Sequence, residues 1–265
     1  MRGTLYAAPS VPRHAATASW SAELLSRRPY CASYAAEAPV IGFAFDAQAG
    51  THAFGSDRRV DFRTRPNGLA YVPQGCDVYS RSDAGGEYLR ITFHPEQNAP
   101  QSFRFSDVID RTAIDAAYRL RRELLAPHGP DALQCERWVH ILERRTAAIL
   151  RQPSPPPTAA AWMTPRRLRV VEELIEAGLE TRITVQDIAD SLGLSAGFFC
   201  RAFRAAVGKS PHDHIIDRRV SHARALLAGT AFDLGTIACE SGFASHAHMT
   251  ATFRKRLGVA PSALR

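Results

Sequence analysis

The sequence is poor in cysteine. Its five cysteines are odd in number and scattered over 265 residues, and no two of them stand in a Cys-x-x-Cys spacing. Disulfide frameworks and zinc ribbons need paired cysteines at short spacings, so the pattern argues against both. Scattered free thiols fit a reducing compartment, and we expect the protein to lie in the cytoplasm.

Long apolar runs are also missing. No stretch approaches the roughly 18 apolar residues that a membrane-spanning helix needs. The first residues, Met1 to Val11, lack a charged start followed by an apolar run, so we expect no secretory signal peptide. The sequence therefore predicts no membrane partner.

Spacings typical of metal sites and of catalytic centres are lacking as well. The first 110 residues contain only His14, His52 and His94, with no carboxylate at ligand spacing. His246 and His248 are two apart, and in a helix such residues point to different faces. No Ser/His/Asp or Cys/His arrangement stands out. We predict no metal, no cofactor and no enzymatic activity.

What the chain does have is positive charge. The net charge is +7, and the sequence pI is near 9.5. Residues 196–224 contain six Lys/Arg against two acids, and residues 251–265 contain four Lys/Arg and no acid. A chain with basic residues gathered in one part suits a polyanionic partner such as DNA.

The C-terminal part contains an internal repeat. The same residue types recur 49 positions after Ile188 and Gly193. Phe203, Gly208 and Pro211 recur 50 positions later, as Phe253, Gly258 and Pro261. The offset changes by one inside the turn, as expected for two copies of one helix-turn-helix unit. In each copy a helix, a glycine turn and a second helix follow one another, the second helix being the type that enters the major groove.

Capping residues and apolar spacing set the bounds of these helices. We expect helices at 165–177, 185–192, 196–207, 211–228, 234–240 and 245–257. The helix at 211–228 has roughly 18 residues and a length of about 27 Å. A rigid spacer of that length brings the two units close to one turn of DNA apart, about 34 Å, and bent DNA would meet the shortfall.

The N-terminal part, residues 1–110, reads as short strands separated by Gly, Pro and Asn, which indicates an antiparallel sheet or small barrel. Leu89, Ile91 and Phe93 alternate with polar neighbours, so one face is core. The first 30 or so residues are expected to be poorly ordered in part. Polar and aromatic residues that could line a ligand site on the other face are His52, Tyr71, Tyr79, Arg81, Tyr88 and Arg90.

Two amphipathic helices follow at 111–151. This helical hairpin either packs on the barrel or pairs with its copy in a homodimer. Four prolines within 152–161 cannot continue a helix and predict a linker between the sensor part and a DNA-binding domain at 162–265.

The segments IADSLGLSAGFFCRAFRAAVGKSPHDHI and GFASHAHMTATFRKRLGVAPSALR resemble the DNA-binding domain of AraC/XylS-family bacterial transcription regulators. GLAYVPQG and GEYLRITF resemble the cupin-like sensor domain of such regulators. The resemblance implies an α+β chain: a cupin-like antiparallel β-barrel with a helical hairpin, then an all-α domain of seven helices with two helix-turn-helix units. It also implies that promoter DNA and RNA polymerase are partners and that the protein activates transcription, at the nucleoid. The cupin-like domain would bind a small-molecule effector or would only form a dimer. A cupin-type enzyme fused to a nucleic-acid module is disfavoured, because the sequence lacks the spacings of a metal site or a catalytic centre.

Arg201 is the residue we expect to read bases, because Arg can donate to guanine O6 and N7 together, and the family position also supports it. Gly197 and Cys200 lie beside it. Arg204, Lys209, Arg254 and Lys255 are expected to contact phosphates. In the second unit His246, Ala247 and Thr250 face outward with Ala251, and so few polar side chains predict weaker base reading there.

Overall fold

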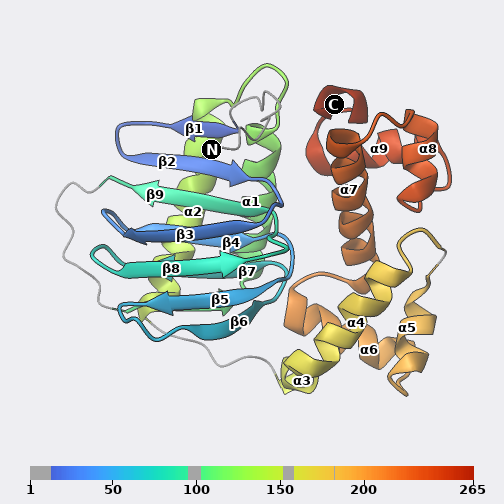
Figure 1. Cartoon of the computed structure of the whole chain (residues 1–265), viewed down its shortest axis with the longest axis horizontal. Coiled ribbons are helices and arrows are strands. Elements are labelled where there is room, and N and C mark those ends of the chain that lie inside the picture. The colour runs from blue at the N-terminus through green and yellow to red at the C-terminus, as the bar shows by residue number, and fades with distance from the viewer. Residues whose placement is uncertain (1–12, 95–102, 152–157, 182) are drawn as a thin grey trace, which may run out of the picture.

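The computed structural model describes residues 13–94, 103–151, 158–181 and 183–265. The N-terminal part contains ten strands and two long helices, and the C-terminal part is helical (Figure 1). An antiparallel sheet domain followed by a helical domain confirms the predicted fold class at this level. The start of the predicted linker, at 152–157, lies outside the described residues.

One sheet has six antiparallel strands in the order β1-β2-β9-β4-β7-β10. These strands are β1 (His14–Ala16), β2 (Trp20–Leu25), β9 (Tyr88–Phe93), β4 (Val40–Ala44), β7 (Gly68–Val72) and β10 (Phe105–Val108). Leu89 and Ile91 of β9 are buried and alternate with the half-buried Tyr88 and Arg90. One face of this sheet is therefore core, as the sequence predicts.

The other sheet has four antiparallel strands in the order β3-β8-β5-β6. They are β3 (Tyr30–Ala35), β8 (Asp77–Ser82), β5 (Gln48–Phe54) and β6 (Val60–Thr64). Among the described residues no strand ladder joins the two sheets. The expected closed barrel is thus corrected to two open sheets.

The first described residues form paired strands, and the rest of the segment expected to be partly disordered, residues 1–12, lies outside the described residues. β1, β2 and β3 lie within residues 14–35, and Trp20 and Ala22 are 1% and 0% exposed. The segment is rich in Ala and Ser, which are weak strand formers. Its stability comes from pairing with β9 and β8, whose partner residues are at least 42 positions away in sequence.

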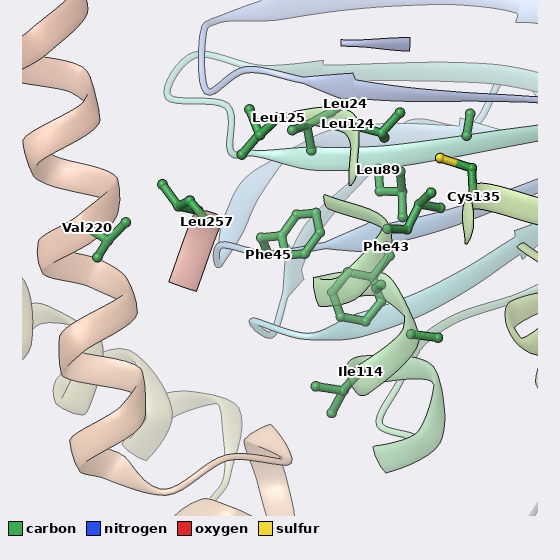
Figure 2. Close-up of a cluster of buried hydrophobic side chains, with 14 of the residues drawn as sticks. Leu24, Phe43, Phe45, Leu89, Ile114, Leu124, Leu125, Cys135, Val220 and Leu257 are labelled. Carbon is green, nitrogen blue, oxygen red and sulfur yellow. The ribbon is translucent and has the colours of Figure 1, made fainter. Parts of the chain in front are cut away.

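The helical hairpin packs on the six-stranded sheet. It consists of α1 (Arg111–Leu124) and α2 (Ala132–Arg151). Leu120 and Leu142 are fully buried in one cluster with Phe43 and Leu89 of the sheet. Figure 2 shows Phe43 and Leu89 in this cluster, together with Leu124 of α1 and Cys135 of α2. The sequence left open whether the hairpin packs on the N-terminal strands or pairs with its copy in a homodimer. Within the chain, it packs on the six-stranded sheet.

Seven helices and a short 3₁₀ helix make up the described C-terminal part. They are α3 (Thr158–Trp162), α4 (Pro165–Ala177), α5 (Val185–Ser191), α6 (Ala196–Val207), α7 (Pro211–Gly229), α8 (Leu234–Glu240), α9 (His246–Leu257) and η1 (Pro261–Leu264). The helices begin at capping residues, since Thr164, Thr184, Ser195 and Ser245 each accept a backbone N–H. Helix α9 begins one residue later than the predicted 245, because Ser245 is its N-cap. The linker is corrected, because α3 begins within 152–161.

The two helix-turn-helix units belong to different cores. The first unit, α5 and α6, shares a core with α3 and α4 through Phe199, Phe203 and Val171. The second unit, α8 and α9, is buried in the same cluster as the sheet and the hairpin (Figure 2). Leu257 of α9 and Val220 of α7 both belong to that larger cluster. Helix α7 therefore runs between two cores.

Candidate nucleic-acid interface

The second helix of the first unit, α6, has one buried and one exposed face. Phe199 and Phe203 are 0% exposed. On the opposite side Gly197, Arg201 and Arg204 are exposed, and Cys200 is half-buried. The preceding turn uses Gly193 with a φ of 67°, a conformation that favours glycine. An amphipathic helix that follows a tight turn and presents cations to the solvent has the shape and charge needed to enter a major groove.

The second unit repeats this arrangement with fewer polar side chains. Met249 and Phe253 of α9 are 0% exposed. Outward-facing residues of α9 are the exposed His246, Ala247, Ala251, Arg254 and Lys255 and the half-buried Thr250. The Thr250 hydroxyl lies 3.2 Å from His246 Nε2, within hydrogen-bond distance. We call α6 and α9 the two reading helices.

Lys209 does not lie where the sequence predicts. Its ammonium is 2.6 Å from Asp217 Oδ2 and 3.1 Å from the centroid of the Tyr118 ring. The side chain is 15% exposed. Burial lowers the pKa of Lys209, and the Asp217 carboxylate opposes that effect. An ammonium held inside the molecule cannot also bind a phosphate, so Lys209 is withdrawn from the predicted phosphate contacts.

Arg256 shows that not every cation of α9 faces outward. Its guanidinium pairs with Asp213 Oδ1 at 2.6 Å and Asp217 Oδ1 at 3.6 Å, both on α7. These pairs fix α9 against the helix that connects the two units. Arg256 follows Arg254 and Lys255 directly in sequence, and both of these face outward. The spacing of residues within α9 cannot show that Arg256 instead meets acids on α7.

The six candidate ligand residues divide among three surfaces. Tyr71 is 8% exposed and stacks on Phe105 in the core under the helices. Tyr79 and Arg81 alternate along β8 with Val78, Ser80 and Ser82, so they face outward. Arg81 pairs with the exposed Asp83. These three candidates therefore lie away from the surface where the two sheets face each other.

His52, Tyr88 and Arg90 lie on the facing surfaces of the two sheets. His52 is the cross-strand partner of Ser80, whose hydroxyl lies 3.2 Å from Tyr30 Oη. Desolvation and the charge of Arg104 lower the pKa of His52. Across from it, burial raises the pKa of the Tyr88 phenol, with Tyr34 and Tyr30 close enough to contribute.

Local packing explains why the Tyr88 side chain fits there. A Cβ on Gly42 would overlap the Tyr88 hydroxyl, so glycine leaves the space that the ring occupies. Arg90 donates to Glu23 Oε2 at 2.6 Å. Tyr30, Gln48 and Ser80 belong to the same polar surface, and Tyr30 donates to Gln48 Oε1 at 3.4 Å. Sequence reasoning missed these three because the pairing of β3 and β8 was not foreseen.

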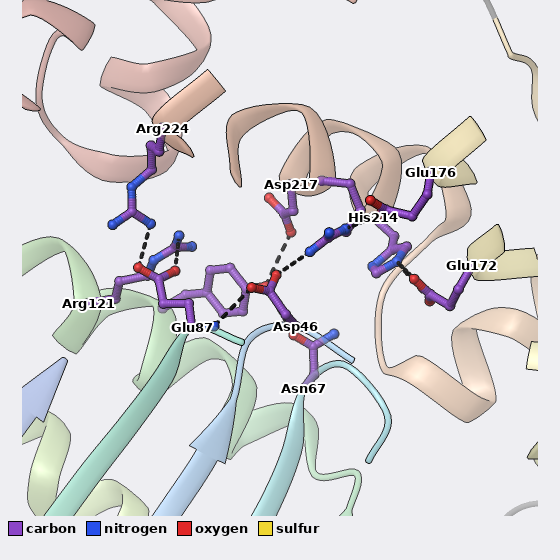
Figure 3. Close-up of polar contacts among 11 residues, drawn as sticks. Asp46, Asn67, Glu87, Arg121, Glu172, Glu176, His214, Asp217 and Arg224 are labelled. Carbon is purple, nitrogen blue, oxygen red and sulfur yellow. Dashed lines mark hydrogen bonds and ion pairs between the residues drawn. The ribbon is translucent and has the colours of Figure 1, made fainter. Parts of the chain in front are cut away.

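A buried ionic network joins the sheet domain to α7 (Figure 3). Arg218 donates to Asp46 Oδ1 at 2.5 Å and to Glu176 Oε1 at 2.6 Å. Glu87 is paired with both Arg121 and Arg224. The partners are up to 172 residues apart in sequence. No local pattern could have identified them, although charged residues at otherwise apolar positions are a signal that such partners exist.

The network fixes the charge states of its acids. Burial opposes ionisation of Asp46, but Arg218 and the backbone N–H of Glu87 outweigh it and lower the pKa of the Asp46 carboxyl. Burial likewise opposes ionisation of Glu172, and His214 outweighs it, so the pKa of Glu172 is lowered. His214 Nε2 lies 3.0 Å from Glu172 Oε1. These carboxylates are charged at neutral pH.

Among the described residues, no helix is both long and apolar enough to cross a membrane. Within the same residues, no group of three or more His, Cys, Asp and Glu side chains is arranged to hold a metal ion.

Comparison with known proteins identifies the C-terminal segment. A family model described as a helix-turn-helix domain matches residues 188–265. The uncharacterized HTH-type transcriptional regulator YidL of Escherichia coli (strain K12) is 32% identical over 99 residues, which are 36% of this chain and 33% of that protein. The HTH-type transcriptional regulator ExsA of Pseudomonas aeruginosa is 32% identical over 78 residues, 29% of this chain and 28% of that protein.

The matched segments span about a third of these relatives. Among solved structures, a transcriptional regulator from Chromobacterium violaceum, described by its AraC-type DNA-binding domain, is 29% identical. The alignment covers 38% of this chain and 89% of that chain, with a TM-score of 0.36.

Proposed function

We propose that this chain, whose C-terminal part is a helix-turn-helix DNA-binding domain of the AraC type, is a transcription regulator that binds two successive major-groove segments of promoter DNA. The observation that carries the proposal is the pair of reading helices. Each has a fully buried apolar face and an outward face that bears arginine without acids, to which α9 adds Lys255. Helix α7, with 19 residues, connects the two units.

In this proposal the two reading helices contribute differently. Arg201, exposed near the start of α6, reads guanine, while Gly197 and Cys200 allow close approach. Arg204, Arg254 and Lys255 bind phosphates. His246, Ala247 and Thr250 contact bases through thymine methyl groups and groove shape. The first unit thus supplies most of the sequence preference.

The test is selection of a binding site from random duplex DNA with the purified full chain. We expect one enriched sequence and an affinity that falls steeply as salt rises, because phosphate contacts release counterions. Enrichment of no sequence would overturn the proposal. Transcription in vitro with bacterial RNA polymerase then shows whether the bound protein activates, as we propose, or represses.

We also propose that the N-terminal domain senses a small molecule on the polar surface between its two sheets. Support comes from His52, Tyr88 and Arg90, which share that surface with Tyr30 and Ser80. A thermal-shift screen of cytoplasmic metabolites, repeated with Arg90→Gln, tests this. A metabolite that raises the melting temperature of the wild type and not of the variant supports the site. Failure of every metabolite favours a domain that only dimerises.

A homodimer is the proposed assembly. Leu133, at the start of α2, is 73% exposed although it is a large apolar residue. Leu133 is the large apolar side chain of the hairpin that a second copy of the chain would cover. Sedimentation of the wild type and of Leu133→Glu gives the test, since a dimer held here dissociates in the variant and a monomeric wild type contradicts the proposal.

A further inference from the structure

Both reading helices end against the same helix of the N-terminal domain. Gly208 caps α6 and Gly258 caps α9, with φ values of 81° and 79°. A Cβ on Gly208 would overlap Ile114, and a Cβ on Gly258 would lie 3.6 Å from Arg122 Nε. Ile114 and Arg122 both belong to α1, about 12 Å apart along its axis. Equivalent points of the repeat are thus supported by one helix.

At the first reading helix, two side chains from the N-terminal domain complete this contact. Arg65 Nη1 donates to the carbonyl of Ala206 at 3.2 Å, and Asn67 Nδ2 donates to the carbonyl of Val207 at 2.8 Å. The last four carbonyls of a helix have no partner inside it. Two of the four at the end of α6 therefore receive their hydrogen bonds from another domain.

The two donors are themselves held in place. Asn67 Oδ1 accepts from the Tyr118 hydroxyl at 3.0 Å, and Asn67 is 1% exposed. Arg65 donates through Nε to Asp107 Oδ2 at 2.7 Å. The Tyr118 hydroxyl also lies 3.3 Å from Asp217 of α7. Both polar atoms of the Asn67 side chain thus have a partner, Nδ2 on α6 of the C-terminal part and Oδ1 on α1 of the N-terminal part.

Backbone strain singles out the same place. In the described part of the chain, the non-glycine residues with positive φ are Asn67, at 65°, and Asp107, at 61°. Such conformations cost on the order of 1 kcal/mol or more and persist where surrounding contacts hold them. Both residues belong to the contact with the end of α6. The strain is an independent indication that this turn has a task beyond joining β6 to β7.

The second reading helix is held differently. Among the hydrogen bonds of the described residues, none runs from the N-terminal domain to the last carbonyls of α9. Instead α9 shares the buried cluster of the sheet domain through Met249, Phe253 and Leu257. One reading helix is therefore anchored by a continuous core, and the other by a few directed hydrogen bonds at its end.

We propose that Arg65 and Asn67, together with α1, are positioning residues that fix the first reading helix relative to the second. The N-terminal domain would then set the half-site spacing that the protein accepts on DNA. The inference rests on the proposed function and deepens it, by naming what orients the two units. Without the hydrogen bonds from Arg65 and Asn67, α6 would adopt more orientations relative to α9. The protein would then accept several spacings between the two half-sites of its DNA.

The variant that isolates this contact is Asn67→Gly. Glycine keeps the positive φ without strain and removes both side-chain hydrogen bonds. Gln74→Gly is the matched control, because Gln74 is an exposed turn residue of the same domain. The DNA is the sequence that the wild type enriches from a random duplex library, remade with one or two base pairs inserted or removed between the half-sites.

For the wild type and Gln74→Gly we expect about tenfold loss of affinity for a single inserted base pair, a cost comparable to a mismatched base pair. Asn67→Gly should bind the original spacing about threefold to tenfold more weakly, as expected for lost hydrogen bonds, and should lose less than about threefold on insertion. An Asn67→Gly profile that parallels the wild type would overturn the inference, and so would tighter binding at the original spacing.

Hydrogen exchange of the free protein gives a readout that needs no DNA. Asn67→Gly should speed exchange of amides at 204–208 about fivefold and leave those of α9 unchanged. Equal acceleration in both helices would indicate global destabilisation and overturn the positioning role, as would no change at 204–208. If the wild type enriches no DNA sequence, the proposed function fails, and the exchange result still decides the inference about position.

Discussion

Lys209 and Asp217 form an ion pair of 2.6 Å on the side of the molecule that faces the N-terminal domain, although Lys209 follows directly on the first reading helix. The pair lies beside the Tyr118 ring, and burial raises the pKa of that phenol well above its usual value. The Lys209 cation therefore stabilises the fold although it lies beside a reading helix. Salt dependence of DNA binding distinguishes such a cation from one that contacts phosphate.

For Lys209→Met we expect a slope of log affinity against log salt equal to that of the wild type. The stability cost is about 3 kcal/mol, because Asp217 loses its nearest buried partner. Arg254→Ala should instead reduce the slope by about 1, the value for one lost phosphate contact. Salt titration of binding to the selected DNA measures both. A reduced slope for Lys209→Met would restore Lys209 to the phosphate contacts.

Arg201→Ala should reduce the preference for the selected site over random DNA by about 1–3 kcal/mol, because a bidentate contact to guanine discriminates between bases. Arg204→Ala, one turn further along the same exposed face, should weaken binding to both DNAs alike. Competition binding with the two DNAs gives the measurement. Uniform weakening by Arg201→Ala would show that Arg201 binds phosphate.

Asp46→Asn should lower the free energy of unfolding at pH 7 by about 3 kcal/mol, since Arg218 loses a buried partner. The pKa of Asp46 is lowered in the folded protein, so its contribution is complete above the unfolded pKa of about 3.9 and is lost as pH falls through the folded value. Urea unfolding from pH 5 towards pH 2 should show the difference between variant and wild type shrinking.

The control for that series is Asp83→Asn, since Asp83 is 86% exposed in its pair with Arg81. Exposed pairs contribute little, and we expect a change within about 0.5 kcal/mol. A constant difference between Asp46→Asn and the wild type at every pH would contradict the charged pair with Arg218.

A fragment of residues 158–265 should keep its first unit and loosen its second. The first unit has its own core, around Phe199 and Val171, whereas Leu257 and Phe253 of the second share theirs with the sheet domain. We expect amides of α9 to exchange faster in the fragment than in the full chain, with those of α4 and α5 unchanged. Equal protection of α9 would show that the second unit needs no partner core.

The helical part of this fold could be predicted closely from sequence because its signals are local. Caps such as Ser195 and Ser245 and the glycines that end each reading helix fix α6 and α9 to within a residue. The same holds for Leu89 and Ile91, whose alternation identified the core face of β9. The periodicity of apolar residues and the helix caps both depend on residues that are close together in sequence, so they can be read from the sequence.

Long-range relationships could not be predicted in this way. Strands β1 to β3 have weak propensity and exist because they pair with β9 and β8. The positions of Lys209 and Tyr71 depend on which domain covers them, and their own neighbours in sequence do not decide it. The DNA contacts of the exposed Arg201 and the outward Arg254 stay predictions, as do those of Cys200, Gly197 and Arg204.

The continuous core beneath α9 has a consequence for the ancestry and the engineering of such chains. The N-terminal domain could not be exchanged for another by cutting within 152–161 alone, because the surfaces of α7, α8 and α9 that complete the sheet domain's interior would meet an unmatched partner. The natural unit of exchange is the sheet domain together with residues 211–265. The first helix-turn-helix unit is then the portable part, free to acquire a new DNA preference on a constant frame.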